Sequence, residues 1–407
     1  MNLSVFTAAL SVPCAHGVPP ARGRIRAEPE DFLVEEVLGF EADGAGSHAL
    51  LVVEKRGANT GWVAAQLARH AGAAVRDVGF SGHKDRHAVT RQSFTFPLAL
   101  QSDVAQCMEW RGEGYAVLAA TRHGRKLRPG SHRANRFELR VRDTQGDRAG
   151  IEACLQRIAA EGVPNYFGPQ RFGREGSNLA RALEWAAGGS APRDRAQRGF
   201  LLSAARSHLF NAVLAERVAS GTWNRCLPGE AVMLDGKRSF FLAAEIDAAL
   251  EDRLRQMDVH PSGPLPGRGE SPATGLARQV EESALASHQA LVALLAAERI
   301  DHERRSLRLP VREFDWAFEG DAALVLRFTL PRGTFATAVL HELLQDAWDA
   351  ARAAKTDRRR TRRLSASRVS SVRRPSQLPA RLQGRREPVR GGSGRRVHAA
   401  DGLANEP

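Results

Sequence analysis

Apolar and polar positions alternate along the first part of the chain with two different periods. Residues 32–37 and 49–53 are rich in branched apolar side chains and predict buried strands. Residues 136–142 alternate without a break, which predicts a strand with one apolar face. Residues 151–158 carry apolar side chains at helical spacing, and the stripe stops at Gly162, which predicts a helix that ends there.

Three further segments have helical spacing. Thr60 precedes one of them and is predicted to cap a helix. Residues 202–218 and 282–300 predict two helices in the middle of the chain. Residues 261–269, which lie between these two, are rich in Gly and Pro and are predicted to form a loop.

The pattern near the end of the folded part returns to that of the beginning. Residues 324–330 alternate as a strand, and residues 334–350 follow as a helix. A late strand and helix of this kind indicate that the chain rejoins the N-terminal sheet. We therefore predict one domain made of residues 1–160 and 310–351, interrupted by an inserted α/β domain over residues 161–309.

Most of the net charge of +13 belongs to the last segment of the chain. Residues 351–407 hold 16 Lys+Arg and 4 Asp+Glu, a net charge of +12. Because this segment has little apolar content, residues 352–407 are predicted to form a disordered, Arg-rich tail. The remaining chain is close to neutral, so nucleic-acid binding by the folded part requires a local basic patch.

Cysteine usage and hydropathy limit the class of protein. The four cysteines stand far apart, which argues against a zinc ribbon, a redox pair or a disulfide framework and fits a reducing cytoplasm. No basic residue precedes the short apolar run of residues 3–12, so a signal peptide is not expected. No stretch approaches the roughly 20 apolar residues of a membrane span. The sequence predicts a cytoplasmic protein without membrane contact.

One short segment, residues 80–90, concentrates residues that carry chemistry. It reads Phe-Ser-Gly-His-Lys-Asp-Arg-His-Ala-Val-Thr, and its single carboxylate is Asp85. The potential cations around this carboxylate are His83, Lys84, Arg86 and His87. Positive charge nearby lowers the pKa of an aspartate from about 3.9 and favours the anion. The segment is suited to hold a reactive carboxylate, and a surface turn with solvated charges has the same pattern.

Five segments in the same order resemble the tRNA pseudouridine synthase D (TruD) family. Residues 79–90 are similar to the family signature, in which the Asp of a Lys-Asp-(basic)-His-Ala-Val-Thr run is the catalytic nucleophile. The other segments are residues 27–36, 162–173, 202–211 and 330–337. The resemblance implies an α+β pseudouridine synthase catalytic domain with a mixed, largely antiparallel sheet, interrupted by an inserted TruD-type domain. It also implies isomerisation of uridine to pseudouridine, at position 13 of tRNA.

The same resemblance implies the residues of an active site. Asp85 is expected to be the nucleophile, with Lys84 next to it and Arg26 as its basic partner from another strand. This reaction needs neither a cofactor nor a metal, so we expect none. The expected substrate is tRNA, and we expect a monomer.

A target base in folded RNA must be unstacked and held in a pocket by an aromatic face and by hydrogen bonds. The resemblance assigns this aromatic to Phe137 of an Asn-x-Phe motif that begins at Asn135, and Phe32 is a second candidate. The strand pattern alone places Phe137 in the core, and an Asn that enters a strand is common in turns.

Basic residues near these positions are candidates for binding the RNA backbone. Residues 122–128, which include Arg125 and Lys126, lie just before Asn135 in the sequence. Arg171 is expected to line a facing wall. Such clusters suit phosphate binding, although arginine runs also occur on solvated surfaces.

Two other classes of function stay open. His83, Asp85 and His87 have the spacing of metal ligands along a strand, which would suit a metal-dependent hydrolase. However, Gly82 indicates a loop at this point, and no second cluster completes a metal shell in the sequence. The other alternative is a non-catalytic RNA-binding protein that keeps the synthase fold.

Overall fold

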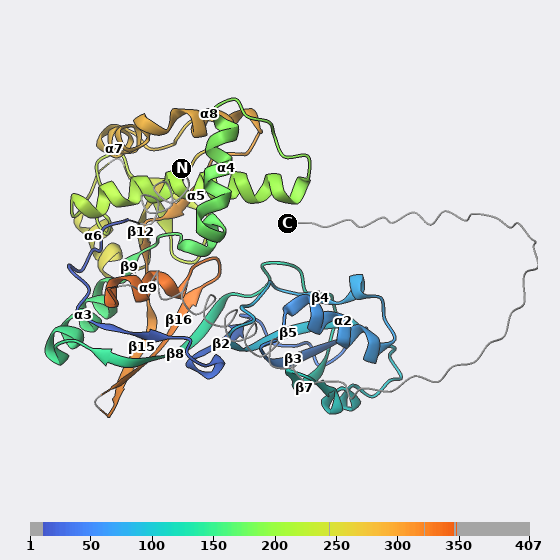
Figure 1. The fold of residues 1–407 in the computed structure, drawn as a ribbon. Coiled ribbons are helices and arrows are strands. Elements are labelled where there is room, and N and C mark those ends of the chain that lie inside the picture. Colours follow the sequence, from blue (N-terminus) through green and yellow to red (C-terminus); the bar gives the residue numbers. More distant parts are fainter. Residues whose placement is uncertain (1–10, 244, 321, 346, 348–407) are drawn as a thin grey trace, which may run out of the picture.

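The computed structural model describes residues 11–243, 245–320, 322–345 and 347 of the chain. The architecture is α+β: a large mixed sheet lies beside a helical layer that is built on a smaller sheet (Figure 1). The tail predicted for residues 352–407 lies outside the described residues.

The large sheet has ten strands in the order β15-β16-β8-β2-β5-β3-β7-β6, with β1 paired to β8 and β4 to β5. Its strands are β1 (Arg22–Ile25), β2 (Phe32–Val37), β3 (His48–Arg56), β4 (Gly79–Phe80), β5 (Val89–Pro97), β6 (Arg111–Gly112), β7 (Tyr115–His123), β8 (Ala134–Gln145), β15 (Arg312–Glu319) and β16 (Ala323–Pro331). In the described part of this sheet, β2 and β5 are the one parallel pair of strands. A mixed, largely antiparallel sheet is therefore confirmed.

The late strand returns to the early sheet, as the alternation of residues 324–330 predicts. β16 pairs antiparallel with β8 over its whole length, from Ala323 opposite Arg142 to Pro331 opposite Ala134. The predicted helix over residues 334–350 is represented by α9 (Ala336–Leu343), and positions 346 and 348–350 lie outside the described residues.

Helix α2 (Thr60–Ala71) packs on the half of the sheet that contains β3 and β5, where Leu67, Phe94 and Phe96 are fully buried. Its N-cap is Asn59, whose side chain accepts a hydrogen bond from the Gly61 amide, so the predicted cap at Thr60 is wrong by one residue. Thr60 instead points inward and binds the neighbouring strand. The short 3-10 turns of this half are η1 (Pro29–Asp31), η2 (Val75–Asp77) and η3 (Val104–Glu109).

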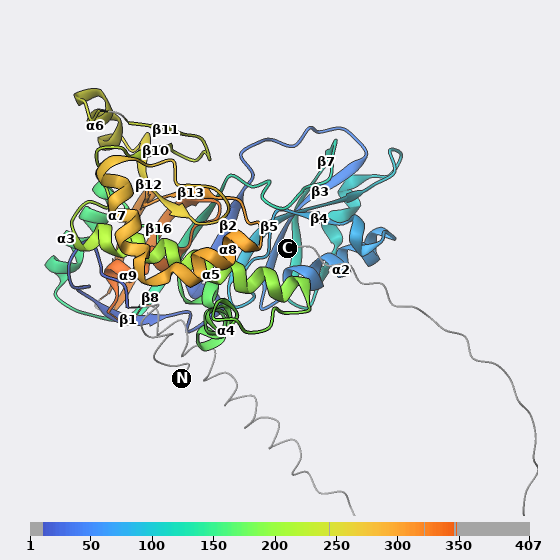
Figure 2. The same cartoon turned by 90° about the horizontal axis from the view of Figure 1, so that it is seen from above.

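The middle of the chain forms the helical layer and the smaller sheet (Figures 1 and 2). The smaller sheet has the order β11-β10-β12-β13. The helices of this region and its approach are α3 (Arg148–Glu161), α4 (Ser177–Ala186), α5 (Arg195–Ala219), α6 (Ala248–Arg255), α7 (Gly275–Leu285) and α8 (Gln289–Ala297), with 3-10 turns η4 (Pro169–Phe172), η5 (Arg174–Gly176) and η6 (Ala286–His288). The strands are β10 (Ala231–Leu234), β11 (Phe240–Leu242), β12 (Val259–Leu265) and β13 (Glu303–Ser306). Seen from above, the N-terminal end of α5 extends toward the half of the large sheet that carries α2 (Figure 2).

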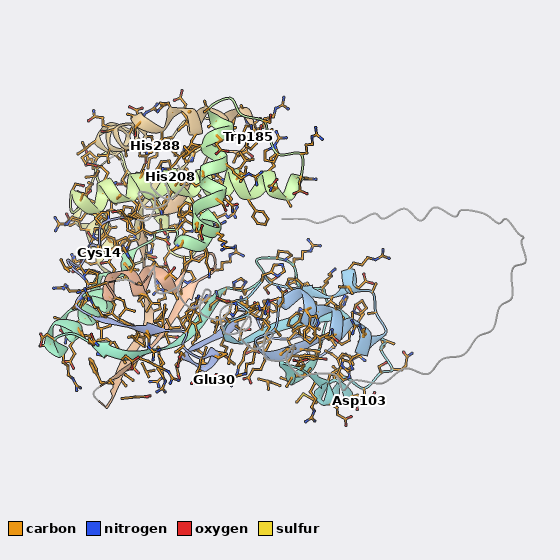
Figure 3. The ribbon with its side chains drawn as sticks, viewed as in Figure 1. Cys14, Glu30, Asp103, Trp185, His208 and His288 are labelled. Carbon is orange, nitrogen blue, oxygen red and sulfur yellow. The ribbon has the colours of Figure 1, made fainter. Side chains whose placement is uncertain are left out.

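Two predicted helices of this layer are present with changes. The predicted helix 202–218 lies within the longer α5, whereas 282–300 is divided between α7 and α8 by the turn η6. At that division His288 lies edge-on to His208 of α5, with ring centroids 4.9 Å apart (Figure 3). The division therefore lies where the chain packs closely on α5.

The loop predicted for residues 261–269 is wrong over its first half, because Pro261 to Leu265 belong to β12. β10 pairs with the beginning of β12, up to Pro261, and β13 pairs with the rest, from Ser262 onward. Each proline therefore has a partner strand on one side only, so its missing N–H group is tolerated. Gly263 fits because a side chain there would collide with Leu307.

The chain enters and leaves the middle region at one place. β9 (Val163–Pro164) pairs antiparallel with β14 (Arg308–Leu309). This pair lies close to the predicted domain limits at residues 160 and 310, which stay a prediction. The apolar core is continuous across the junction and contains Phe137 of the large sheet as well as Phe210 of α5. Of the helices described, none is long and apolar enough to cross a membrane.

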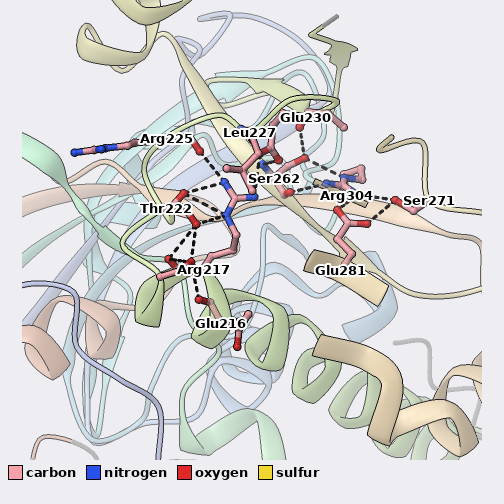
Figure 4. A network of polar contacts seen from close by, with 12 residues as sticks. Glu216, Arg217, Thr222, Arg225, Leu227, Glu230, Ser262, Ser271, Glu281 and Arg304 are labelled. Carbon is pink, nitrogen blue, oxygen red and sulfur yellow. Dashed lines mark hydrogen bonds and ion pairs between the residues drawn. The ribbon is translucent and has the colours of Figure 1, made fainter. Parts of the chain in front are cut away.

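A chain of buried polar contacts stabilises the middle region (Figure 4). Arg217 of α5 donates to Glu230 at 2.9 Å, and both side chains are almost fully buried. Glu230 accepts a hydrogen bond from the backbone of Ser262, whose hydroxyl accepts one from Arg304 at 2.9 Å. Arg304 in turn binds Glu281 at 2.7 Å. Burial raises the pKa of Glu230, and the charge of Arg217 opposes this rise.

We expect Arg217→Met to lower the free energy of unfolding by about 3–5 kcal/mol, because it leaves the carboxylate of Glu230 buried without its guanidinium. Urea unfolding measures this change. The matched control is Arg278→Met, which breaks an exposed ion pair with Glu282 and should cost less than about 0.5 kcal/mol. Equal losses in the two variants would show that the buried pair has no special role in stability.

Candidate active site

The parallel pairing of β2 and β5 brings two distant segments of the chain together. Leu33 of β2 lies opposite Val89 of β5, so both strands begin at the same edge of the sheet. The residues that precede the two strands therefore meet at this edge. Nη1 of Arg26, which precedes β2, lies 3.2 Å from Oδ2 of Asp85, which precedes β5.

Arg26 is held in a constrained position. Its backbone φ is 59°, a region that residues other than glycine rarely adopt. Its guanidinium lies 4.0 Å above the centre of the Phe32 ring, and the residue is 8% exposed. Burial lowers the pKa of Arg26, and the charge of Asp85 opposes this shift.

The carboxylate of Asp85 is oriented by contacts with Arg26 and His87 and is still accessible. Oδ2 faces Arg26, and Oδ1 accepts a hydrogen bond from the backbone N–H of His87 at 2.9 Å. The side chain of Asp85 is 20% exposed, whereas that of Arg26 is 9% exposed. A buried cation on one side favours the ionised carboxylate, and the exposed side leaves room for a ligand.

A row of side chains across the sheet forms the floor beneath this ion pair. Thr90 of β5 lies opposite Lys55 of β3 on one side and opposite Val34 of β2 on the other. Val34 lies opposite Phe137 of β8, and Phe137 lies opposite Phe328 of β16. Side chains at directly opposed positions point to the same face of a sheet. The floor therefore changes from polar to aromatic across the sheet.

The aromatic part of the floor is tightly packed. The Phe137 ring stacks on Phe328 with centroids 5.3 Å apart and meets Phe32 edge-on at 6.1 Å. Phe32 in turn lies under the guanidinium of Arg26. Phe137 is thus a core residue, as its strand pattern indicates, and it also belongs to the aromatic group below the Arg26–Asp85 pair.

Lys55 is a residue of this site that the sequence analysis missed. Its ammonium donates to the backbone carbonyls of Ala58, Lys84 and Asp85, at 3.2, 3.4 and 3.1 Å respectively. Burial lowers the pKa of Lys55 to about 8, against the opposing charge of Asp85. The signal was present in the sequence, because Leu51, Val53 and Lys55 occupy alternate positions of one buried strand.

Lys84 does not stand free beside Asp85. Its ammonium lies 2.9 Å from Oε2 of Glu36, and both side chains are buried. Glu36 lies on β2 and also accepts a hydrogen bond from the backbone of Ser93. Of the other cations expected around Asp85, His83 and Arg86 are exposed.

The loop that carries Asp85 is fixed at several points. The Lys84 amide donates to the Thr60 hydroxyl at 3.1 Å, and this hydroxyl donates to the Gln92 side chain. Gln92 also donates to the carbonyl of Gly82. At the start of the loop, the carbonyl of Ser81 accepts from the Gly130 amide at 2.7 Å. The loop is therefore a preformed element.

Several buried polar atoms near the floor have no hydrogen-bond partner among the described residues. They are Nε of Arg26, Oγ of Ser81, Oγ1 of Thr90, Nδ1 of His132 and Oδ1 of Asn135. An unpaired buried polar group is costly and calls for an explanation such as a ligand. Burial, together with the charges of Lys84 and Arg332, lowers the pKa of His132 to about 4, so its ring is neutral at neutral pH.

The predicted RNA-binding residues lie in separate places. Lys126 donates to the carbonyl of Arg76, and the adjacent Leu127 amide binds Thr95 near the far end of β5, so neither Arg125 nor Lys126 is in contact with Asp85. Arg125 is exposed. Arg171 lies in η4 of the middle region, where Nη1 donates to Ser203 of α5 at 2.8 Å.

Arg122, which begins the same basic run, has a structural role. Its guanidinium donates to a ring of backbone carbonyls, those of Gly46, Leu98, Ala99, Leu100 and Ser102. It therefore ties the end of β7 to the loop that follows β5.

The segment from Ser81 to Ala88 is a loop and not a strand. The regular alternation that would place His83, Asp85 and His87 on one side is therefore absent. Across the described residues, no group of three His, Cys, Asp or Glu side chains is arranged to hold a metal ion. The geometry gives the metal-dependent alternative no support.

The fold and this arrangement define an α+β protein with a preformed carboxylate site. The site lies at the edge of a mixed sheet where the parallel strands β2 and β5 begin. A family model described as tRNA pseudouridine synthase D (TruD) matches residues 14–181 and 192–343. A tRNA pseudouridine synthase D of Nitrosococcus oceani is 47% identical over 331 residues, which are 81% of this chain and 92% of that protein. One of Methylococcus capsulatus is 47% identical over 337 residues, 82% of this chain and 94% of that protein. The chain belongs to the tRNA pseudouridine synthase D family.

A solved structure supports the fold. The crystal structure of a candidate tRNA pseudouridine synthase D from Methanosarcina mazei matches with a TM-score of 0.60 at 20% sequence identity. The match covers 83% of this chain and 95% of that chain. The α+β architecture is thus shared with a distant member of the family.

Lys55→Met should lower kcat by about 10²-fold at neutral pH, because the carbonyls that flank Asp85 lose their common donor and the loop shifts. In the unmodified protein, kcat should also fall above about pH 8, where Lys55 loses its proton. The pH profile of single-turnover rates measures both effects. Lys237→Met, at an exposed lysine, is the control. A fall above pH 8 that persists in Lys55→Met would assign the titration to another group.

Proposed function

We propose that this protein isomerises uridine to pseudouridine in tRNA, with Asp85 as the nucleophile acting on a flipped-out base. The observation that carries the proposal is the accessible carboxylate of Asp85, held 3.2 Å from a buried guanidinium beside an aromatic group that contains Phe32 and Phe137. The names of the similar proteins support the same reaction.

The reaction places defined demands on the site. The N1–C1′ bond breaks, the uracil turns, and a C5–C1′ bond forms, while the proton of C5 is lost and N1 gains one. Atoms and electrons balance without a redox partner. A carboxylate that adds to C1′ or to the base, and later leaves, divides this change into easier steps. Arg26 keeps Asp85 ionised for the attack, and the His87 amide orients the second oxygen.

The unpartnered polar atoms match the edge of a uracil. Uracil presents one N–H donor at N3 between two carbonyl acceptors. Oδ1 of Asn135 is an acceptor suited to N3–H, while Nε of Arg26 and the hydroxyl of Thr90 are donors suited to the carbonyls. Phe32 and Phe137 supply the aromatic surface that an unstacked base requires.

For the substrate, we propose uridine at position 13 of tRNA, as the family resemblance implies. The protein acts as a monomer in the cytoplasm in this proposal. Arg125, Lys126 and Arg171 are proposed to contact the RNA backbone, and their separation suits an extended ligand better than a single nucleotide.

Asp85→Asn should lower the single-turnover rate by at least about 10⁴-fold, because an amide cannot act as the nucleophile. RNA affinity should stay within a few-fold of the original, since the phosphate contacts are unchanged. Filter binding and single-turnover kinetics on one tRNA transcript measure the two quantities. Asp143→Asn, which changes an exposed aspartate paired with Arg24, is the control. Activity of Asp85→Asn within tenfold of the original would remove Asp85 from the mechanism.

Incubation of the purified protein with unmodified tRNA transcripts, in the presence of EDTA, tests the activity directly. We expect pseudouridine at position 13 by chemical mapping, since the reaction requires no metal. Activity that appears only after a divalent metal is added would favour a metal-dependent enzyme. RNA binding without pseudouridine in any transcript would favour the non-catalytic RNA-binding protein.

A further inference from the structure

Two arginines of the middle region share one aromatic ring. The guanidinium carbon of Arg305 lies 4.2 Å from the centre of the Phe167 ring, and that of Arg171 lies 5.2 Å from the same centre. Phe210 lies 5.6 Å from Arg305, and Phe335 lies 5.8 Å from Arg171. The two cations thus lie against one group of phenylalanines, which come from the segment between β9 and η4, from α5 and from the segment that precedes α9.

No carboxylate among the described residues forms an ion pair with either arginine. Arg305 donates to the side chain and the carbonyl of Asn165 and to the carbonyl of Gly333, which are neutral acceptors. Arg171 donates to the hydroxyl of Ser203, and its Nε is buried without a partner in the described part of the chain.

This pair differs from two of the buried arginines of the same region. Arg217 and Arg304 are each paired with a buried glutamate, at 2.9 and 2.7 Å. Burial lowers the pKa of both Arg171 and Arg305, and the charge of Arg171 lowers that of Arg305 further. Arginine nevertheless stays protonated in proteins at neutral pH. Two like charges held together without an acid form a site that an anion would stabilise.

The surroundings identify which anion fits. Arg305 binds the carbonyl of Gly333, and the preceding residue, Arg332, binds the carbonyl of Gly130. The amide of Gly130 binds Ser81, where the loop that carries Asp85 begins. The arginine pair is therefore connected, through two short turns, to the candidate active site. A ligand that reaches both places must be extended, and RNA is extended and also anionic along its length.

The surface beside the pair is open to such a ligand. Phe200 precedes Ser203 by three residues on α5, so both lie on one face of the helix. Its side chain is 63% exposed, an unusual position for a phenylalanine. An exposed aromatic side chain of α5 thus lies one helical turn from the serine that Arg171 binds.

We propose that Arg171 and Arg305 together bind one phosphodiester of the substrate RNA, at a nucleotide other than the reacting uridine. This proposal rests on the proposed function for the identity of the ligand as RNA. Arg171 offers a phosphodiester oxygen its Nε, which has no hydrogen-bond partner among the described residues. Each Nη atom of Arg305 carries two N–H groups, of which one donates to Gly333 or to Asn165, so a second remains for an anion. The contacts with the Phe167 ring hold both guanidinium groups in place before the RNA binds, so the two side chains lose little conformational entropy on binding.

Backbone-neutralised RNA tests the proposal. A set of short RNA substrates carries one uncharged methylphosphonate each, at successive positions, and is bound to the original protein and to Arg171→Gln. We expect one position whose neutralisation weakens binding by the original protein by about tenfold and leaves binding by Arg171→Gln unchanged. Arg171→Gln should also weaken binding of natural RNA by about tenfold and reduce the slope of log affinity against log salt by about one.

The control is Arg278→Gln, which removes an arginine of the same region that is paired with acids, and which should respond to every methylphosphonate as the original protein does. Arg305→Lys is a second variant, which keeps the positive charge and loses the planar guanidinium. We expect its RNA affinity, like that of Arg171→Gln, not to change when the phosphate at that one position is neutralised. If every methylphosphonate weakens RNA binding by Arg171→Gln and by the original protein to the same extent, the two arginines are structural and the proposal is wrong. Conversion of the unmodified RNA by the original protein is scored separately, so a failure of the proposed function is distinguished from a failure of the phosphate site.

Discussion

The parallel pairing of β2 with β5 forces the segments that precede the two strands to the same edge of the large sheet. Arg26 and Asp85 are distant in the sequence and become an ion pair because of this one pairing. In a fully antiparallel sheet, the beginning of each strand faces the end of its neighbour, and the pair would not form. The position of Phe32 and the location of the Asp85 loop above the floor follow from the same constraint.

Buried cations in this molecule are satisfied in three different ways. Lys84, Arg217 and Arg304 are each neutralised by a buried carboxylate, which makes a closed structural contact. Lys55 is held by backbone carbonyls, which keep the ammonium in place while its charge stays uncancelled near Asp85. The buried Arg308 and the partly buried Arg171 and Arg305 have only neutral acceptors among the described residues. Positive charge is thus left uncompensated at two places where the substrate is proposed to bind, although the chain before the tail is close to neutral.

Much of the fold could be predicted from the sequence because local alternation decides which face of a strand is buried. Residues 136–142 and 324–330 alternate cleanly, and they pair with each other in β8 and β16. The strand at Pro261 could not be predicted, because its prolines are tolerated only through the partial overlap of β10 and β13 along β12, a property of the assembled sheet. The cap at Asn59 was missed because Asn59 and Thr60 are adjacent and both suit an N-cap.

Some residues of the candidate site could also be predicted from the sequence, and others could not. Asp85 and Arg26 could be proposed as site residues from the sequence, because each lies in or next to a short segment that resembles a family motif. The role of Lys55 depends on its register opposite Thr90 in β5, and that of Arg305 depends on the ring of Phe167, to which nothing in the local sequence points. A short sequence motif does not reveal residues whose role depends on the pairing of distant strands or on distant side chains.

The junction at β9 and β14 explains how a region built on its own small sheet can serve a site on another sheet. The chain leaves at Val163 and returns at Leu309 as one antiparallel pair, so the middle region is attached through two strands side by side. Asn165 directly follows β9, Arg305 lies three residues before β14, and the two side chains bind each other. Arg305 is therefore fixed close to the attachment, whereas Arg171 is bound to Ser203 of α5 in the helical layer. The proposed phosphate contact thus combines one residue next to the attachment with one held by the helical layer.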